Sequence, residues 1–149
     1  MSMTTEHTVA LEVDPKPGDM QAIVKGLVEF NTSQVGGETQ QYLLATVRNP
    51  EGSLVGGLLA VTYLGWLHVQ AVWLPESLRG KGYGGTLMKI AEDEAIRRGC
   101  KNAFVETLSF QALPFYEKCG YQVFSKLEGM PPGGARYALT KSLLRPDSN

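Results

Sequence analysis

The sequence predicts an α+β fold in which a mixed, mostly antiparallel sheet has one parallel βαβ unit at its centre, in a three-layer arrangement. The first observation is a row of three strand-like segments, 41–48, 53–64 and 66–74, that are rich in β-branched and aromatic residues and are separated by short turns. The second is the helical pattern of 83–98 followed by the strand-like segment 102–108. A strand, a helix and a second strand in this order predict a parallel βαβ unit.

Periodicity and turn residues also predict the remaining helices and strands. Residues 7–13 (HTVALEV) alternate between apolar and polar positions, which predicts a strand. Residues 18–34 carry apolar side chains at helical spacing before Gly36 and Gly37, which predicts a helix. A short helix is expected over 111–119. Two closing strands, 121–127 and 136–143, flank the turn sequence MPPGG.

Length and composition favour a globular protein of one domain, residues 1–149. The chain is 43% hydrophobic and 19% charged, which is typical of folded domains rather than of disordered chains. Its formal net charge of -1 argues against a general nucleic-acid binder, because such proteins need a concentrated basic surface. This net charge does not exclude a local basic pocket that binds one phosphorylated small molecule.

The two cysteines, Cys100 and Cys119, are not in a CxxC pair, and only two histidines are present. A metal site is therefore not expected, and both cysteines are predicted to be buried free thiols. The N-terminus has neither a basic start nor a long apolar stretch, so no signal peptide is expected. No apolar run is long enough for a membrane span, and the predicted location is the cytosol.

The segment LRGKGYGGTL, residues 78–87, is unusually rich in glycine. Gly80, Gly82 and Gly85 fit the GxGxxG pattern of dinucleotide-binding folds, and Glu106 lies at a distance suited to a ribose contact. However, the loop follows an antiparallel meander, and too little chain remains for a doubly wound sheet. A P-loop is excluded because no GK[ST] is present. Four glycines exceed what a simple turn needs, and successive backbone N–H groups at a helix start bind phosphate well.

Two motifs resemble the GNAT superfamily of acyl-CoA N-acyltransferases. The run Arg79-Gly80-Lys81-Gly82-Tyr83-Gly84 matches its R/Q-x-x-G-x-G/A signature, between a strand and a helix as in that family. Residues 112–121, with Ala112, Tyr116 and Tyr121, resemble its A-x-x-x-Y-E-K-x-G-F/Y stretch. The resemblance covers the order of elements over most of the chain and is specific over 66–121.

The resemblance implies that coenzyme A, supplied as acetyl-CoA, is the cosubstrate. Its pyrophosphate would lie on the backbone amides of residues 80–85, and the predicted cofactor-binding residues there are Arg79, Gly80, Lys81, Gly82, Tyr83, Gly84 and Gly85. Its pantetheine arm would run along Val72, Trp73 and Leu74, in a gap where that strand splays from strand 102–108. Ser109 stands where the family commonly has Asn near this arm, and it is either a weaker contact of the same kind or the N-cap of the next helix.

An amine acceptor must be neutral to attack a thioester, so a general base or a water chain ending in one is needed. The period of two places His68, Gln70 and Val72 on one face of strand 66–74. His68 lies eleven positions before Arg79, where related acetyltransferases carry a catalytic Glu or His, and its ordinary pKa of about 6.5 suits a base. Glu106 is a rival base. Tyr116 matches the family's general acid, which would protonate the leaving thiolate.

The resulting prediction is an N-acetyltransferase that transfers acetyl from acetyl-CoA to a primary amine by direct attack in a ternary complex, with no acyl-Cys119 intermediate. The acceptor, a small-molecule or a protein amine, would be shaped by residues 18–40 and 128–135. A homodimer is expected because many members of the family dimerise. A non-catalytic acyl-CoA-binding regulator and a protein lysine or N-terminal acetyltransferase stay open as alternatives.

Overall fold

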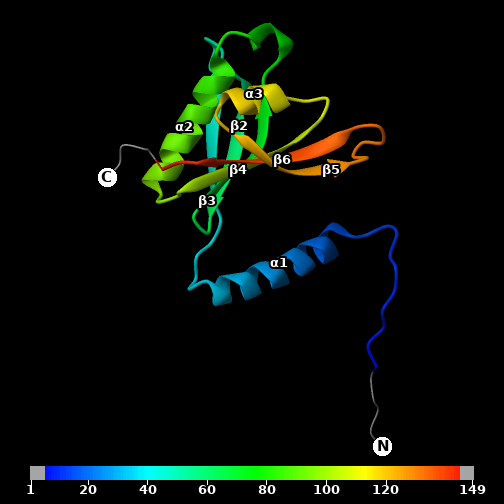
Figure 1. The fold of residues 1–149 in the computed structure, drawn as a ribbon. Helices are drawn as coiled ribbons and strands as arrows, with labels where there is room; N and C mark the ends of the chain where they lie inside the picture. The colour runs from blue at the N-terminus through cyan, green and yellow to red at the C-terminus, as the bar shows by residue number, and fades with distance from the viewer. Residues whose placement is uncertain (1–5, 145–149) are drawn as a thin grey trace, which may run out of the picture. The chain divides into compact units, whose positions relative to one another are not determined.

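The computed structural model describes residues 6–144, which form two compact units that divide between Glu38 and Thr39 (Figure 1). The first unit contains α1 (Pro17–Gln34), and all strands belong to the second. The expectation that residues 1–149 make one domain stays a prediction. No helix within residues 6–144 is both long enough and apolar enough to cross a bilayer.

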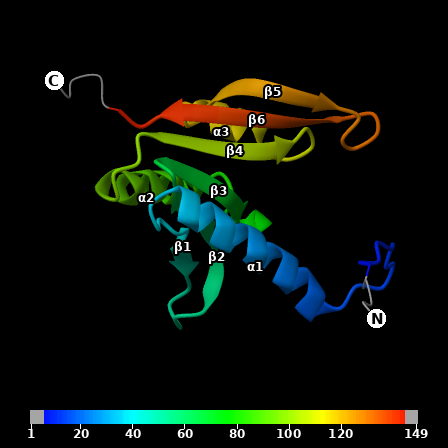
Figure 2. The ribbon, with the colours of Figure 1, turned by 90° about the horizontal axis from the view of Figure 1, so that it is seen from below.

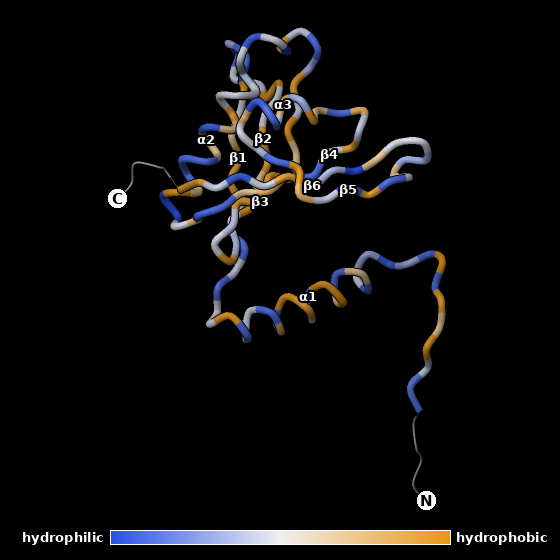
Figure 3. Tube along the Cα trace, viewed as in Figure 1, coloured by the Kyte–Doolittle hydropathy of each residue, from blue (hydrophilic) through white to orange (hydrophobic). Residues whose placement is uncertain are grey.

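Helix α1 forms where the sequence predicts it, and it has ordinary start and stop signals. Pro17 occupies the first turn, where its missing N–H costs nothing, and Asp19 places a negative charge near the positive end of the helix dipole. At the other end the Gly37 N–H donates to the Thr32 carbonyl oxygen at 2.9 Å, and Gly36 adopts a φ of 71°. Hydrophobic and hydrophilic residues alternate along the helix (Figure 3).

The predicted strand over residues 7–13 is wrong. Residues 6–12 have no regular secondary structure, and residues 13 and 14 lie in a bend. Alternating hydrophobicity shows only that a segment could cover one face of a sheet. A strand forms where a neighbour satisfies its backbone N–H and C=O groups, and the sequence pattern does not supply that partner.

The second unit is a six-stranded sheet in the order β1-β2-β3-β4-β6-β5. The strands are β1 (Gln41–Arg48), β2 (Leu54–Tyr63), β3 (Trp66–Trp73), β4 (Asn102–Leu108), β5 (Gln122–Glu128) and β6 (Ala135–Ser142). All neighbouring pairs are antiparallel except β3 and β4, which are parallel and are joined through α2 (Tyr83–Arg97). The predicted meander, the βαβ unit and the closing hairpin are therefore confirmed.

Helix α3 (Leu113–Lys118) is shorter than the predicted segment 111–119. The Ala112 N–H donates to Thr107 Oγ1 at 3.2 Å, and the Leu108 N–H donates to Gln111 Oε1 at 2.7 Å. These side-chain bonds hold residues 108–112 in a turn, so the helix begins two residues later than expected.

The core lies between the sheet and the helices α2 and α3, which Figures 1 and 2 show on the same side of it. One stripe of α2 is buried, and its apolar members are Leu87, Met88, Ala91 and Ala95. They pack in one cluster with Tyr116 of α3 and with strand residues that include Leu58, Leu67, Val69, Ala103, Val105 and Leu139. Burying such side chains contributes on the order of 1.5–3 kcal/mol each.

The parallel pair β3–β4 separates part of the way along its length. Its register runs only from Trp66 opposite Asn102 to Val69 opposite Val105. Beyond these residues β3 continues to Trp73 on β2, while β4 continues to Leu108 on β6. In Figure 1 the strands β1–β3 and β4–β6 turn away from each other. The predicted splay is confirmed, and the space that opens after Val69 and Val105 is called the fork below.

A β-bulge in β3 changes which side chains face the helices. Ala60 lies opposite Val69 and Leu59 lies opposite Ala71, so Gln70 is an extra residue in the ladder. The prediction that His68, Gln70 and Val72 share one face is therefore wrong. Because paired residues point to the same side, Val72, opposite Leu58, faces the core as Val69 does, and His68 faces away from it.

Gly57 of β2 is a point where two backbones approach closely. A Cβ at this position would lie 2.5 Å from the Ala45 carbonyl oxygen on β1, which is backbone and cannot move aside alone. We expect Gly57→Ala to lower the free energy of unfolding by about 2–3 kcal/mol, measured by urea denaturation. Gly85→Ala is the matched control. A Cβ there meets nothing within 4 Å, so this variant should be unchanged or stabilised by up to about 1 kcal/mol. Equal stabilities of the two variants would contradict this account.

Neither Cys100 nor Cys119 forms a disulfide bond within residues 6–144. Cys100 is buried, whereas Cys119 is only half-buried, so the prediction that both are buried is wrong for Cys119. Its place at the end of α3, opposite Lys141 of β6, leaves it partly accessible. Burial still raises the pKa of the Cys119 thiol, which makes it a poor nucleophile at neutral pH.

Candidate active site

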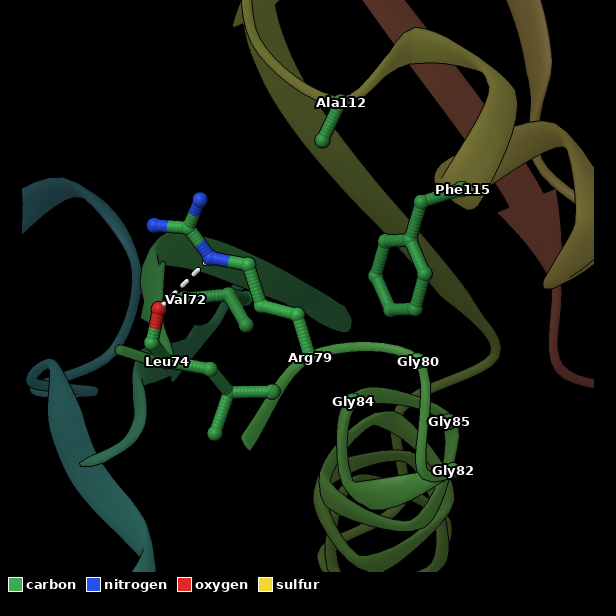
Figure 4. Close-up of a pocket in the computed structure, with 9 residues that line it drawn as sticks. All are labelled: Val72, Leu74, Arg79, Gly80, Gly82, Gly84, Gly85, Ala112 and Phe115. Carbon is green, nitrogen blue, oxygen red and sulfur yellow. Dashed lines mark hydrogen bonds between the residues drawn. The ribbon is translucent and has the colours of Figure 1, made fainter. Parts of the chain in front are cut away.

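A cavity of about 370 Å³ lies between the end of β3, the start of α2 and helix α3 (Figure 4). It brings together residues from three separate parts of the sequence. Its lining residues are Val72, Leu74, Arg79, Gly80, Gly82, Gly84, Gly85, Ala112 and Phe115. Seven of these nine were predicted from the sequence to bind the cofactor.

A second hollow of about 390 Å³ shares four of these residues and extends along the end of β3. Its lining residues are Val72, Trp73, Leu74, Arg79, Phe110, Gln111 and Ala112. The two hollows together therefore follow the core-side edge of β3 from the fork to the glycine loop. This is the path that an extended ligand with an anionic end would take.

The glycine loop ends in a helix start that favours an anion. Gly82 is the N-cap of α2 with a φ of 86°, a left-handed conformation that glycine adopts without strain. The N–H groups of the first turn of any α-helix have no partner within the helix, and the helix dipole adds positive charge there. No acidic residue stands in the first turn of α2 to neutralise it. A phosphate group fits this position electrostatically.

Arg79 closes the loop between β3 and α2. Its Nε donates a hydrogen bond of 2.9 Å to the Leu74 carbonyl oxygen (Figure 4). Its guanidinium lies 5.3 Å from the centre of the Trp73 ring. The side chain thus joins the two ends of the segment 74–79 and adds a positive charge to the cavity wall.

Gly84 allows α3 to approach α2. A Cβ on Gly84 would lie 2.9 Å from Phe115 Cε1, and Figure 4 shows the Phe115 ring pointing from α3 toward the first turn of α2. The missing side chain at Gly84 therefore makes room for an aromatic wall of the cavity.

Tyr116, the predicted general acid, is adjacent to this wall but is not among the residues that line either hollow. It is 6% exposed and packs edge-on against Phe115 and Tyr121, with ring centres 5.1 Å and 6.2 Å away. Burial raises the pKa of Tyr116, and the nearby Cys119 adds to the increase. Its hydroxyl is therefore fully protonated at neutral pH.

His68, the predicted base, lies on the opposite face of the sheet, one residue before the fork. Its ring stacks on Phe104 of β4, with the ring centres 4.2 Å apart and the planes within 7° of parallel. Burial lowers the pKa of His68, and the negative charge of Glu106 partly opposes this. The imidazole is therefore neutral at pH 7, which is the form that can accept a proton.

Glu106, the rival base, follows Val105 directly and is the first residue of β4 beyond the fork. One of its carboxylate oxygens accepts a hydrogen bond of 2.9 Å from Arg136 Nε on β6, in a partly exposed ion pair. Glu106 is two positions from Phe104 on the same strand, so it shares the face that His68 occupies.

Ser109 is not the N-cap of α3, because that position is Ala112. Its Oγ accepts a hydrogen bond of 3.1 Å from the Ala135 N–H, which ties the loop after β4 to the start of β6. Ser109 lines a third hollow of about 480 Å³ with residues of the β5–β6 hairpin, including Lys126, Glu128 and Tyr137. It lines neither of the two hollows along β3.

Several wall residues were not assigned to the site from the sequence. Phe110, Gln111 and Phe115 were not predicted to line it, and Ala112 was recognised only as part of a motif. The sequence did contain a signal for Phe115, because this large apolar residue lies between Ala112 and Tyr116 in the same motif. Lys81 and Tyr83, in contrast, are in the glycine loop but line neither hollow.

Comparison with known proteins agrees with the fold and the motifs. Residues 19–121 match the acetyltransferase (GNAT) family. An acetyltransferase from Agrobacterium fabrum is 37% identical over 120 residues, which are 80% of this chain and 85% of that protein. A blasticidin-S acetyltransferase from Streptomyces morookaense is 39% identical over 93 residues, 62% of this chain and 68% of that protein.

A solved structure of an acetyltransferase from Agrobacterium tumefaciens superposes with a TM-score of 0.84 at 34% identity, covering 91% of this chain and 99% of that one. An acetyltransferase structure from Bacillus cereus superposes with a TM-score of 0.79 at 27% identity, covering 94% and 99%. The chain therefore belongs to the acetyltransferase (GNAT) family and is an acyltransferase.

Proposed function

We propose that the chain transfers an acetyl group from acetyl-CoA to the nitrogen of a primary amine, by direct attack in a ternary complex at the fork. The observation that carries this proposal is the separation of β3 from β4 after Val69 and Val105. The glycine loop and Tyr116 lie on the helix side of this opening, and His68 faces the other side. An acyl donor and an amine can therefore reach one point from opposite faces of the sheet.

The lining of the cavity fits coenzyme A. The amides of residues 80–85 and the guanidinium of Arg79 suit the pyrophosphate, and the apolar wall of Val72, Leu74 and Phe115 suits the pantetheine arm. When bound, acetyl-CoA supplies an activated thioester. We further propose that a backbone N–H in the segment 72–74 stabilises the negative charge that develops on the carbonyl oxygen.

In the proposed chemistry His68 accepts a proton from the amine, and Tyr116 gives a proton to the departing sulfur. The two assignments match the local electrostatics, because burial favours neutral imidazole at His68 and protonated phenol at Tyr116. Glu106 acts on His68 through its charge, with its carboxylate held by Arg136.

We propose a small-molecule amine as the acceptor. The relative from Streptomyces morookaense is a blasticidin-S acetyltransferase, which supports this class over a protein acceptor. The test is release of free thiol from acetyl-CoA with a panel of small amines, peptide N-termini and lysine peptides. Turnover with peptides alone would favour the protein acetyltransferase, and binding without turnover on any acceptor would favour the non-catalytic binder. A cytosolic location and a homodimer stay predictions.

The cofactor assignment predicts thermal stabilisation by acetyl-CoA. A ligand at about 100 times its Kd adds roughly 2.7 kcal/mol, which raises Tm by about 5–10 °C in a domain of this size. Gly82→Val should lose this shift, because it forces a β-branched residue into a φ of 86° within the cavity. Gly99→Val is the control, since Gly99 has a φ of 90° and lines neither cavity hollow. No shift of the wild-type protein at millimolar acetyl-CoA would overturn the assignment.

A further inference from the structure

The chain contains a partly buried charged cluster that the proposed chemistry does not use. Glu92 of α2 is 9% exposed, and its carboxylate accepts two short hydrogen bonds. Tyr121 Oη donates to Glu92 Oε2 at 2.9 Å, and Lys141 Nζ donates to Glu92 Oε1 at 2.8 Å. Burial, followed by the charge of Glu92, raises the pKa of Tyr121, so its hydroxyl stays a donor at all ordinary pH values.

Lys141 extends this cluster to the end of α3. Its Nζ also donates to the Cys119 carbonyl oxygen at 2.7 Å and lies 5.6 Å from the centre of the Tyr121 ring. Cys119 is the C-cap of α3, whose last carbonyls have no partner within the helix. The lysine therefore satisfies one of these groups and places a positive charge at the negative end of the helix.

Helix α3 needs such an anchor. It has six residues, and a helix of this length has no stability of its own in water. Its first end is held through the Thr107 Oγ1 bond to the Ala112 N–H, and its last end through Lys141 and Glu92. Tyr116 lies between these two anchors, and its ring packs on Tyr121, a member of the cluster.

The cluster also connects α3 to the helix that begins at the glycine loop. Glu92 belongs to α2, which starts at Tyr83 directly after Gly82. Through Glu92 and Lys141, the helix that carries Tyr116 is fixed to the helix whose first turn lines the cavity. This partly buried ion pair therefore fixes the far end of α3 to α2, whereas Phe115 and Gly84 form the contact between α3 and the first turn of α2.

We propose that Glu92 and Lys141 are positioning residues that hold Tyr116 at the leaving sulfur. This inference rests on the proposed function, in which Tyr116 is the proton donor. The cluster acts through the orientation of α3, and neither charge touches the reacting atoms. Loss of the anchor should therefore lower kcat and leave KM for acetyl-CoA nearly unchanged. The decrease in kcat should occur only in enzyme that retains the Tyr116 hydroxyl.

The test is a double-mutant cycle with Lys141→Met and Tyr116→Phe, measured by steady-state thiol release. Because small misplacements of catalytic groups cost up to about 100-fold, we expect Lys141→Met to lower kcat by about tenfold. In the Tyr116→Phe background the same substitution should lower kcat by less than about twofold, since its effect passes through the missing hydroxyl. Lys89→Met is the matched control, because Lys89 forms an exposed ion pair with Asp93 on the same helix as Glu92.

An equal decrease in kcat from Lys141→Met in the wild-type and Tyr116→Phe backgrounds would overturn the inference. A general loss of folded enzyme would lower kcat by the same factor in both. If Lys141→Met alone does not fold, the double variant Glu92→Leu/Lys141→Met takes its place in the cycle, since it leaves no lone buried charge. An unchanged kcat in Tyr116→Phe itself would remove the proton-donor assignment and this inference with it. If Tyr116→Phe lowers kcat and the losses from Tyr116→Phe and Lys141→Met are additive in the double variant, the inference is wrong but the proposed function is retained.

Discussion

Replacing Tyr116 by phenylalanine is expected to lower kcat by about 100-fold or more, because general acid catalysis contributes about 10²–10⁴-fold. The change deletes one hydroxyl and keeps the ring that packs against Phe115 and Tyr121. The fold and the binding of acetyl-CoA should therefore be retained, and KM for acetyl-CoA should change little. The measurement is steady-state kinetics of thiol release with the best acceptor of the amine panel.

The pH profile adds a second readout for Tyr116. Burial raises its pKa above the ordinary value of 10.0, so the donor stays protonated across the accessible range. The kcat of the wild-type enzyme should therefore not fall at alkaline pH through a titration with a pKa below 10.0. Tyr63→Phe removes the hydroxyl of a half-buried tyrosine on β2 and should behave as wild type. A rise in KM at constant kcat for Tyr116→Phe would mean that the tyrosine only packs against the ligand.

Replacing His68 by alanine is the second large effect that we expect. Loss of a general base should lower kcat/KM for the amine by about 100-fold or more at pH 7. The remaining rate should rise with pH, because a larger fraction of the amine is then neutral without help from the protein. Phe104 loses its stacking partner in this variant, so CD and Tm measurements must confirm that the variant is folded.

The wild-type profile follows from the direction of the pKa shift. His68 accepts a proton only in its neutral form, so activity is present above its pKa and is lost as the pH falls through it. Because burial lowers that pKa from 6.5, the acidic limb of kcat/KM should lie below pH 6.5. Glu106→Gln removes the charge that raises the pKa, so this variant should move the limb to still lower pH. If Glu106→Gln is inactive and His68→Ala is not, Glu106 is the base.

Local patterns were sufficient for most of the elements. The strand-like segments between 41 and 74, the helical pattern of 83–98 and the turn sequence MPPGG are each defined by a short stretch of sequence, and the structure has the expected elements there. The strand predicted over residues 7–13 was wrong for the opposite reason. Its alternation is local, but a strand needs a partner that lies elsewhere in the chain.

The same distinction applies to the site. The glycine loop is contiguous in sequence, so its place at the start of α2 and on the cavity wall could be predicted. The face of His68 could not, because the bulge at Gln70 depends on how β3 pairs with β2. Glu92 is a similar case. In sequence it is one more charged residue of a helix, and only the packing of α2 against β6 and the end of α3 gives it Tyr121 and Lys141 as partners.

The sequence by itself determined the family resemblance, the order of strands and helices from residue 41 onward, and the position of the glycine loop at the start of α2, because each of these depends on residues that are close together in the chain. Only the tertiary structure decided where β3 and β4 separate, that the cavity and His68 lie on opposite faces of the sheet, and that an ion pair anchors α3. These features arise from strand register and from contacts between residues that are far apart in the chain, and a local pattern carries no information about either.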